Sequence, residues 1–477
     1  MEGYIKQEDR KKILLLCDDI RMHSGVATMA REFVINSAHK LNWFNVGAAV
    51  KHADKGKILD LSSEINKKLG IEDSNVKILP NDGYGDPQLV RKLIKQERPD
   101  AIFIFTDPRY WVWLFDLERE IRSKLPIVWL NIWDEFPTPK YNENYYDSVD
   151  TLLAISKQTK LINELVLGEK AKDKLLEYIP HGIDNNIFRP LDEATDKEFS
   201  EFKNNVLQGK DYDFVLYYNS RNIHRKRPGD VILAYKYFCD SIGKDKAKKC
   251  ALIMHTQPVD QHGTDLNAVK EALCDPEYVN IFFSASRISP TQMNAMYNIA
   301  DATLLISSNE GWGLSLTESM MSGTMIIPNV TGGMQDQCRF VDKEGKWFTP
   351  TKDIPSNHRG TYTEHGEWTE PVFPNNISLA GSVPTPYIFD DRCSPEDAAA
   401  AIKRVYDLPK QERKKRGLAG REWAMSDEAG FTALKMSNRI ADAIQSTIDN
   451  FTPRSRYDLI KVENSPKKLI EHKLTGY

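Results

Sequence analysis

Two glutamates, Glu310 and Glu318, stand within a run of glycine, serine and threonine at 307–323. An apolar run ends near Ile306 and a helix is expected to open near Ser315, so Glu310 stays on the loop while Glu318 lies about one turn into the helix. This offset lets the two carboxylates reach different parts of one extended ligand. Each could accept a charge-assisted hydrogen bond from a hydroxyl, worth roughly 1.5–3 kcal/mol, and a sugar or ribose diol supplies such hydroxyls.

The residues between the two glutamates predict an anion site. Gly311 and Gly313 stand where a strand feeds the N-terminus of a helix. Such a junction leaves backbone N–H groups unpaired, and the helix end adds about half a positive charge. The alternative is an ordinary helix start with solvated glutamates. Two acids, glycines and an aromatic residue occur together at one strand–helix junction, and this combination favours ligand binding.

A basic cluster follows the apolar run at 214–218. It consists of Arg221, Arg225, Lys226 and Arg227. The carboxyl end of a parallel strand is the edge at which open α/β sheets bind ligands. Arg221 with Lys226 could therefore stabilise the charge of a diphosphate leaving group without a metal. The alternative is a solvated basic turn.

A third candidate lies in the first half of the chain. Asp18 is followed by a loop that reaches Gly25 just before a predicted helix. Backbone N–H groups at this position could meet a phosphate. One glycine is not a dinucleotide-binding fingerprint, so this loop is a weak indication by itself.

Short apolar runs alternate with helix-like stretches along the whole chain. This pattern is typical of parallel sheets covered by helices, and it predicts two doubly wound, Rossmann-like α/β units in series. The runs are 13–17, 44–50, 76–79, 101–105, 127–132, 151–155 and 178–179, then 214–218, 251–254, 279–283, 302–306 and 325–327. The clearest predicted helices are 26–38, 87–96, 228–239, 290–299 and 316–321.

Polar stretches divide the chain. A charged segment after Pro190 predicts a first domain at 1–195 and a second at 196–430, followed by a C-terminal helix and tail at 431–477. The irregular stretch 331–394 is too long for an ordinary connection, so we expect a lid or a small insertion.

The predicted C-terminal helix, at 428–450, is amphipathic and needs a partner surface. Its apolar positions are Leu434, Ile440, Ala441, Ile444 and Ile448.

Composition excludes several classes of protein. The chain has 477 residues, of which 41% are hydrophobic and 28% charged, which is ordinary globular usage. A net charge of −4 argues against a protein that coats nucleic acid by bulk charge. No apolar stretch is long enough for a transmembrane helix, and the N-terminus lacks a signal-peptide pattern. The cysteines are scattered, so we expect a reducing cytoplasm.

Taken together, the motifs resemble the family-4 retaining glycosyltransferases of the GT-B fold, from Lys12 to about Asn450. In that fold, two Rossmann-like domains face each other across a cleft, and a C-terminal helix crosses back to the first domain. The resemblance rests on Ser24-Gly25-Val26, on Ile179-Pro-His-Gly-Ile-Asp184 with Phe188-Arg-Pro, on Arg221 with Lys226, on Asn298-Ile-Ala-Asp301, and on Glu310 and Glu318 with Gly323.

The resemblance implies a role for each of these positions. Glu318 would hold the ribose of a nucleotide diphosphate sugar, and Glu310 a hydroxyl of the transferred sugar. Arg221 and Lys226 would neutralise the diphosphate, and Gly25 would let the first-domain loop approach it. Backbone N–H groups of the turn would face the donor, with His181 at the cleft edge. The turn comprises Gly311, Trp312, Gly313 and Leu314.

The resemblance also implies transfer with retention of configuration and no bound metal or other cofactor. A front-face attack, in which the leaving phosphate takes the acceptor proton, would need no dedicated carboxylate.

This chain departs from the family at one place. Many members carry His-Asp after a first-domain strand, but here the residues are Trp133 and Asp134. The change leaves the identity of the sugar open. Asp134 is kept as a candidate catalytic residue, with a helix cap as the alternative.

Asp211 and Asp213 match a metal-binding Asp-x-Asp pattern, but their place before a strand favours a turn. The segment 108–113 combines basic and aromatic residues, which could stack on a sugar or a nucleobase or pack inward.

The expected acceptor is a hydroxyl of a glycan or glycoconjugate. One alternative is a phage enzyme, working in the cytoplasm of an infected bacterium, that glycosylates hydroxymethylated bases in DNA. Another is a catalytically silent sugar-nucleotide-binding protein. A glycosidase fits the paired acids less well, because they stand at a helix start rather than flanking a scissile bond.

Overall fold

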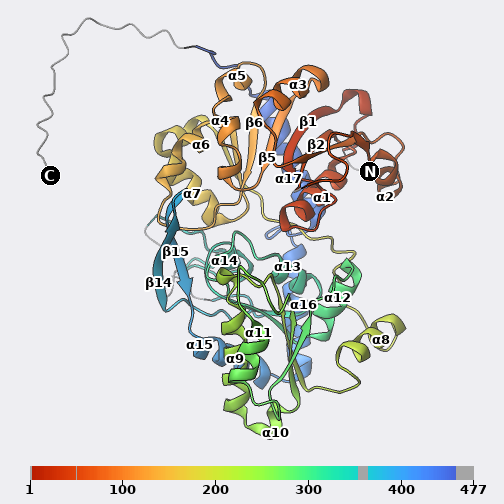
Figure 1. Cartoon of the computed structure of the whole chain (residues 1–477), viewed down its shortest axis with the longest axis vertical. Helices are drawn as coiled ribbons and strands as arrows, with labels where there is room; N and C mark the ends of the chain where they lie inside the picture. The colour runs from red at the N-terminus through yellow and green to blue at the C-terminus, as the bar shows by residue number, and fades with distance from the viewer. Residues whose placement is uncertain (1–2, 50, 353–361, 363, 458–477) are drawn as a thin grey trace, which may run out of the picture.

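The computed structural model describes residues 3–49, 51–352, 362 and 364–457. Two α/β units lie one above the other, with the N-terminal unit at the top of Figure 1. Each is a sheet covered by helices on both faces, and a single hydrophobic cluster runs from the first sheet into the second. The expected class, two doubly wound units arranged as in GT-B proteins, is confirmed. The boundaries at 195/196 and 430/431 stay predictions.

The first sheet has eight strands in the order β3-β4-β2-β1-β5-β6-β7-β8, all parallel except β3. The central residues of its inner strands are buried, which explains why they read as unbroken apolar runs. The sequence did not predict β3, a two-residue strand that is partly exposed. The strands are β1 Lys11–Asp18, β2 Leu41–Ala49, β3 Leu59–Asp60, β4 Val76–Asp82, β5 Ala101–Phe105, β6 Ile127–Asn131, β7 Thr151–Ala154 and β8 Leu175–Tyr178.

The second sheet has five parallel strands in the order β11-β10-β9-β12-β13. The order reverses at β9, so the carboxyl ends of β9 and β12 form the edge at which such folds bind ligands. The strands are β9 Phe214–Asn219, β10 Cys250–His255, β11 Asn280–Ser284, β12 Ala302–Leu305 and β13 Met325–Pro328.

Several helices begin at a residue whose side chain caps them. Ser24, for example, accepts a hydrogen bond from the backbone N–H of Ala27 at the start of α1. The helices are α1 Gly25–Ser37, α2 Ser62–Leu69, α3 Pro87–Glu97, α4 Val112–Phe115, α5 Glu118–Arg122, α6 Glu143–Asp147, α7 Lys157–Leu167, α8 Lys197–Val206, α9 Pro228–Ile242, α10 Lys244–Ala247, α11 Leu266–Leu273, α12 Pro290–Ile299, α13 Leu314–Met321, α14 Met334–Gln337, α15 Pro395–Asp407, α16 Lys410–Met425 and α17 Ala433–Asp449. No helix among these is long and apolar enough to cross a membrane.

Helix α17 crosses back onto the first domain, as expected, and lies along α1 (Figure 1). The Ser437 hydroxyl donates to the Glu32 carbonyl, and the hydroxyls of Thr151 and Thr447 lie 2.6 Å apart. Ile440 and Ile444 are buried there, together with Ala441, whereas Leu434 is 53% exposed and does not belong to the packed face.

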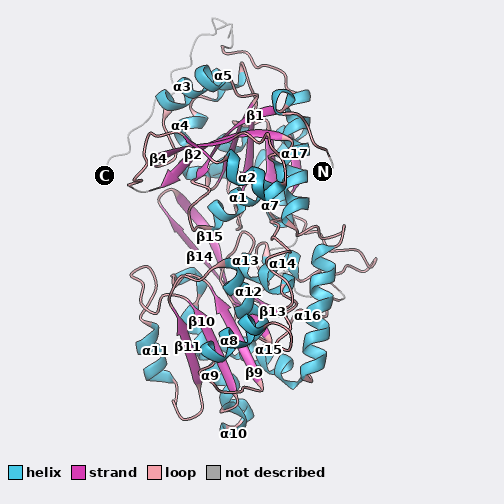
Figure 2. Ribbon diagram, turned by 90° about the vertical axis from the view of Figure 1, so that its right-hand side faces the viewer, coloured by secondary structure: helices cyan, strands magenta, loops and turns pink. Residues whose placement is uncertain are grey.

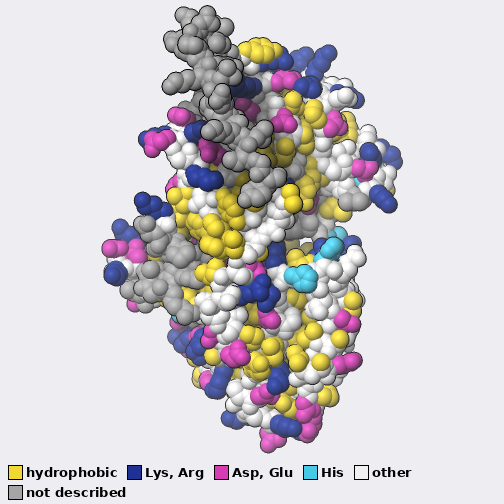
Figure 3. Space-filling model, turned by 60° about the vertical axis from the view of Figure 1, so that its left-hand side comes forward, with side chains coloured by type: hydrophobic (Ala, Val, Ile, Leu, Met, Phe, Trp, Pro, Cys, Tyr) yellow, Lys and Arg dark blue, Asp and Glu magenta, His cyan; other side chains and the backbone are white. Residues whose placement is uncertain are grey.

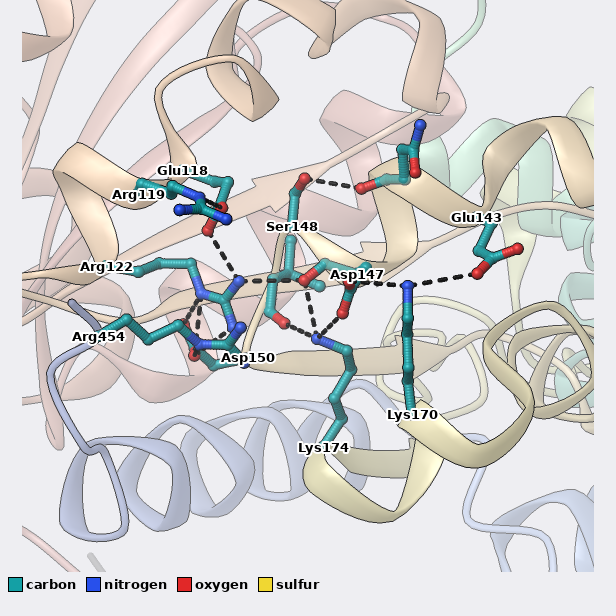
Figure 4. Close-up of polar contacts among 12 residues, drawn as sticks. Glu118, Arg119, Arg122, Glu143, Asp147, Ser148, Asp150, Lys170, Lys174 and Arg454 are labelled. Atoms are coloured by element: carbon teal, nitrogen blue, oxygen red, sulfur yellow. Dashed lines mark hydrogen bonds and ion pairs between the residues drawn. The ribbon is translucent and has the colours of Figure 1, made fainter. Parts of the chain in front are cut away.

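A buried ion network holds the chain after α17 against the first domain (Figure 4). The Arg122 guanidinium is fully buried and donates to Asp150 and Glu118. Lys174 donates to the Asp147 carbonyl at 2.9 Å. The Arg454 backbone N–H donates to the Arg122 carbonyl, so the network fixes the position of the C-terminal segment.

The stretch 331–394 contains an antiparallel hairpin, β14 Asn376–Ser382 and β15 Thr385–Arg392, which the sequence did not predict. Residues 353–361 and 363 of the expected insertion lie outside the described residues. The hairpin rises beside the junction of the two domains (Figures 1 and 2). Phe389 N–H donates to the Phe136 carbonyl, and Asp391 N–H donates to the Ser308 carbonyl. The hairpin therefore contacts both domains.

Candidate active site between the two domains

The glycine-rich turn after β12 meets the first domain directly. A Cβ placed on Gly311 would lie 3.0 Å from the Ile132 carbonyl oxygen and 2.9 Å from Cδ1 of Ile155. A Cβ on Gly25 would lie 3.4 Å from Cδ1 of Leu314. The tips of α1 and α13 thus approach each other. The predicted donor-binding turn lies at this interface between the domains, called the seam, where Gly311 meets Ile132 and Gly25 meets Leu314.

Two cations converge on the Glu310 carboxylate. Lys226 Nζ pairs with one carboxylate oxygen, and Arg225 Nη1 lies 3.4 Å from the other. The Ser307 hydroxyl donates to Glu310 at 2.8 Å. Burial by itself would raise the pKa of Glu310, but Lys226 and Arg225 outweigh it and hold this pKa below its usual value. Glu310 is therefore an ionised group on a fixed loop.

Arg221 is not part of this cluster. Its Nε lies 3.0 Å from Oδ2 of Asp260, and its side chain is 61% exposed. Arg225, from the same basic run, takes the place next to Glu310 and also donates to the Asn309 carbonyl at 2.7 Å. The sequence indicated a basic turn here but could not say which of its cations faces the seam.

Glu318 lies one turn into α13 with a single neutral partner. The Tyr297 hydroxyl donates to its carboxylate at 2.6 Å and itself accepts from Asn219 at 2.9 Å. Burial raises the pKa of Glu318 to about 7. The two glutamates thus differ in charge state near neutral pH.

The turn between them presents backbone N–H groups. Within the described part of the chain, the N–H groups of Gly311, Trp312 and Gly313 donate to no protein acceptor. The Trp312 side chain is buried, and its indole N–H donates to Thr317 at 2.9 Å. Trp312 therefore contributes its backbone to the seam and its ring to the core.

Two glycines after β13 support this turn, and the sequence reading missed them. A Cβ on Gly332 would lie 2.1 Å from the Glu310 carbonyl oxygen, and one on Gly333 would lie 2.1 Å from that of Gly311. Any other residue would push the loop away. The Thr-Gly-Gly run at 331–333 was the available signal.

On the first-domain side, Asp134 faces the cationic cluster. Burial raises its pKa to about 6, while the charge of Arg225 opposes that rise. Trp133, at the family's histidine position, points away from the cluster. Its indole N–H donates to the Glu135 carbonyl at 2.8 Å, and its ring packs against Tyr141. Asp134 rather than Trp133 is therefore the side chain of this segment that faces the cations.

His181 is buried at the same seam, between the rings of Phe105 and Trp312. Burial lowers its pKa to about 3. Its Nδ1 has no hydrogen-bond partner among the described residues. His181 is thus a neutral imidazole at neutral pH.

Asp211 and Asp213 lie far from this seam. They precede β9, at the opposite edge of the sheet, beside a surface cavity of about 550 Å³ that Lys410 and Arg413 also line. That cavity is separate from the glutamate cluster. Among the described residues, no group of three or more potential ligands could hold a metal ion.

The fold and the seam define a two-domain α/β protein with a glycine-rich turn and paired glutamates between its domains. Residues 199–354 match the model of the family "Glycosyl transferases group 1". This match includes Arg225, Lys226 and both glutamates, and it supports a glycosyltransferase. No curated protein matches the chain.

Solved structures share the fold at low sequence identity. Sucrose-phosphate synthase of Thermosynechococcus elongatus aligns with a TM-score of 0.64 at 13% identity, covering 92% of this chain and 100% of that one. Anabaena HepE in complex with UDP-glucose aligns with a TM-score of 0.61 at 14% identity, covering 92% of this chain and 100% of that one. A glycosyltransferase of Rickettsia africae aligns with a TM-score of 0.61 at 15% identity, covering 93% of this chain and 100% of that one.

Proposed function

We propose that this protein is a retaining glycosyltransferase that moves a sugar from a nucleotide diphosphate sugar to an acceptor hydroxyl. The observation that carries the proposal is the convergence of Lys226, Arg225 and Glu310 beside the free N–H groups of the α13 tip. Backbone donors and cations suit a diphosphate, and a fixed carboxylate suits a sugar hydroxyl.

The donor would extend along α13. Glu318, one turn from the tip, is placed to accept hydrogen bonds from ribose hydroxyls, and Glu310 from a hydroxyl of the transferred sugar. Lys226 and Arg225 would stabilise the leaving diphosphate. Arg221 would join them only after leaving Asp260. Gly25 would bring the first-domain loop to the phosphate, and His181 would line the seam as a neutral group.

In this proposal, side chains and backbone groups stabilise the charge of the diphosphate, so we propose a metal-independent reaction. Retention follows from front-face attack, in which the leaving phosphate oxygen takes the acceptor proton. Asp134 faces the same cluster from the first domain, and in our proposal it contacts the reacting sugar. A hexosyl or pentosyl donor is compatible with this arrangement.

The acceptor would bind against the first domain. Tyr110 is 47% exposed and lies 4.6 Å from the Tyr84 ring, whereas Trp111 is buried. The 108–113 segment is therefore part core and part exposed aromatic surface, which suits stacking on a sugar ring. Hydrophobic side chains gather at the level where the domains meet (Figure 3). A glycan or glycoconjugate hydroxyl is our proposed acceptor, with a DNA base as the alternative.

A donor screen tests the proposal. Thermal shift with UDP-, GDP- and ADP-sugars should give one nucleotide class that raises the melting temperature. Turnover is then measured with that donor on sugars, glycoconjugates and hydroxymethylated DNA. Glu318→Ala should weaken donor binding. Specific binding without transfer or hydrolysis on any acceptor would favour a silent sugar-nucleotide-binding protein.

A further inference from the structure

An acid pair is buried where the first domain, the loop after β13 and the hairpin meet. Glu135, Thr331 and Asp391 are each 0% exposed. Thr331 Oγ1 lies 3.1 Å from Oε1 of Glu135 and 2.7 Å from Oδ2 of Asp391. The three residues come from segments far apart in sequence, so this contact joins both domains to the hairpin.

The contact between Thr331 and the two acids needs more hydrogens than the threonine can supply. A threonine hydroxyl has one hydrogen, so it can donate to only one of the two carboxyl groups. If both were ionised, the other contact would set two electron-rich oxygens against each other. The second oxygen of Glu135, Oε2, has no hydrogen-bond partner among the described residues. One of the two acids therefore carries a proton, because two electron-rich oxygens in contact away from water repel each other unless a hydrogen lies between them.

The surroundings favour Glu135 as the protonated acid. The charged groups near it among the described residues include Asp134 in its own segment, Asp390 and Asp391 on β15, and Arg225, which already pairs with Glu310. Burial first, then the nearby carboxylates, raises the pKa of Glu135 well above its usual value.

We propose that Glu135 is a protonated positioning residue that donates to Thr331 Oγ1 while Thr331 donates to Asp391. This chain of hydrogen bonds holds the first-domain segment that carries Asp134 against the loop that carries Glu310. Thr331 directly precedes Gly332, which packs on the Glu310 backbone, and Asp391 N–H donates to Ser308 at 3.0 Å. The kinetic consequence rests on the proposed function, but the position of the proton does not.

Infrared difference spectroscopy locates the proton without any substrate. The spectrum of the full-length protein at pH 7 minus that of Glu135→Gln should show the C=O stretch of a protonated carboxyl. Asp391→Asn is the matched control and should leave that band in place. A carboxylate signal from Glu135, or a band that only Asp391→Asn removes, would overturn the assignment. Should Glu135→Gln not fold, Thr331→Val serves instead, because loss of its hydroxyl must shift the band.

Kinetics test the positioning role. Thr331→Val should lower kcat roughly 10- to 100-fold, as a small misplacement of reacting groups does, with donor KM changed by less than about threefold. Thr331→Ser keeps the hydroxyl and should restore the rate. Glu135→Gln, whose amide donates the same bond, should stay active, whereas Glu135→Leu should not. A wild-type kcat in Thr331→Val would overturn the positioning role. So would an equal loss of kcat in Glu135→Gln and Glu135→Leu. Absence of any transfer by the wild type would reject the proposed function and leave the infrared result standing.

Discussion

Two of the places where charged side chains are buried use their hydrogen-bond donors differently. At the amino-terminal edge of the first sheet, Arg122 and Lys174 direct their hydrogens to carboxylates and backbone carbonyls (Figure 4). At the seam, Lys226 and Arg225 meet Glu310, Arg225 is 43% exposed, and the neighbouring N–H groups of the α13 tip lack protein acceptors in the described structure. A network whose donors all have partners stabilises the fold, whereas the unused donors at the seam are available to the ligand that we propose.

The largest effect is expected when the ion network around Arg122 is broken. Arg122→Leu removes a fully buried guanidinium and strands Asp150 and Glu118, so the free energy of unfolding should fall by about 3–5 kcal/mol. Denaturant titration measures it. Arg91→Leu, which removes an exposed ion pair with Glu120, is the control and should have little effect. Equal losses of unfolding free energy in both variants would contradict a special contribution of the buried network.

The next effect belongs to the seam. Lys226→Met should lower turnover roughly 100-fold or more, because the proposed stabiliser of the leaving diphosphate is lost. Lys174→Met is the matched control, a buried lysine of the other network. It should lower the melting temperature and leave the turnover of the folded fraction unchanged. Steady-state rates at saturating donor separate the two variants, and a normal rate in Lys226→Met would remove the diphosphate role.

A smaller effect follows from Glu318. Its pKa of about 7 means that the carboxylate gains a proton as pH falls below neutrality, so nucleotide affinity should weaken about tenfold for each further unit. The folded-state pKa is raised, so the contribution of Glu318 to stability is largest below about 4.5 and falls as pH rises through about 7. Calorimetry between pH 5.5 and 8 measures the affinity. Glu318→Gln should flatten its pH dependence, and an unchanged profile would exclude Glu318 from the donor site.

The smallest expected effect is none. Removal of divalent cations with a chelator should leave turnover unchanged, because cations and backbone donors of the chain stabilise the phosphates in our proposal. The measurement compares rates before and after chelation, with added Mg²⁺ or Mn²⁺ as the control. Strict metal dependence would call for a site near Asp211 and Asp213 or elsewhere in the chain.

The sheets were predictable from sequence, and the reason is burial. Strands such as β5 Ala101–Phe105 are buried on both faces and read as unbroken apolar runs. The hairpin was not predictable in this way. Strand β14 is mostly exposed and carries small and polar residues, so no apolar run marks it.

The site was predictable as a set of motifs but not as a geometry. The spacing of Glu310 and Glu318 indicated the turn and the helix, and both lie as expected. Which cation faces Glu310 depends on the path of the loop, where Arg227 adopts a φ of +54°, and residue type alone cannot supply that. The inward direction of the Trp133 ring depends on the Glu135 carbonyl and the Tyr141 ring, and residue types alone do not predict that these groups meet it.

The chain passes between the domains twice, and the two passes touch. Ile183 forms a parallel bridge with Thr432, and a Cβ on Gly182 would lie 2.2 Å from the Thr432 carbonyl oxygen. The connection is thus a two-stranded hinge rather than a single tether. A relative movement of the two domains that keeps this bridge would have to bend both segments together, at Ile183 and at Thr432.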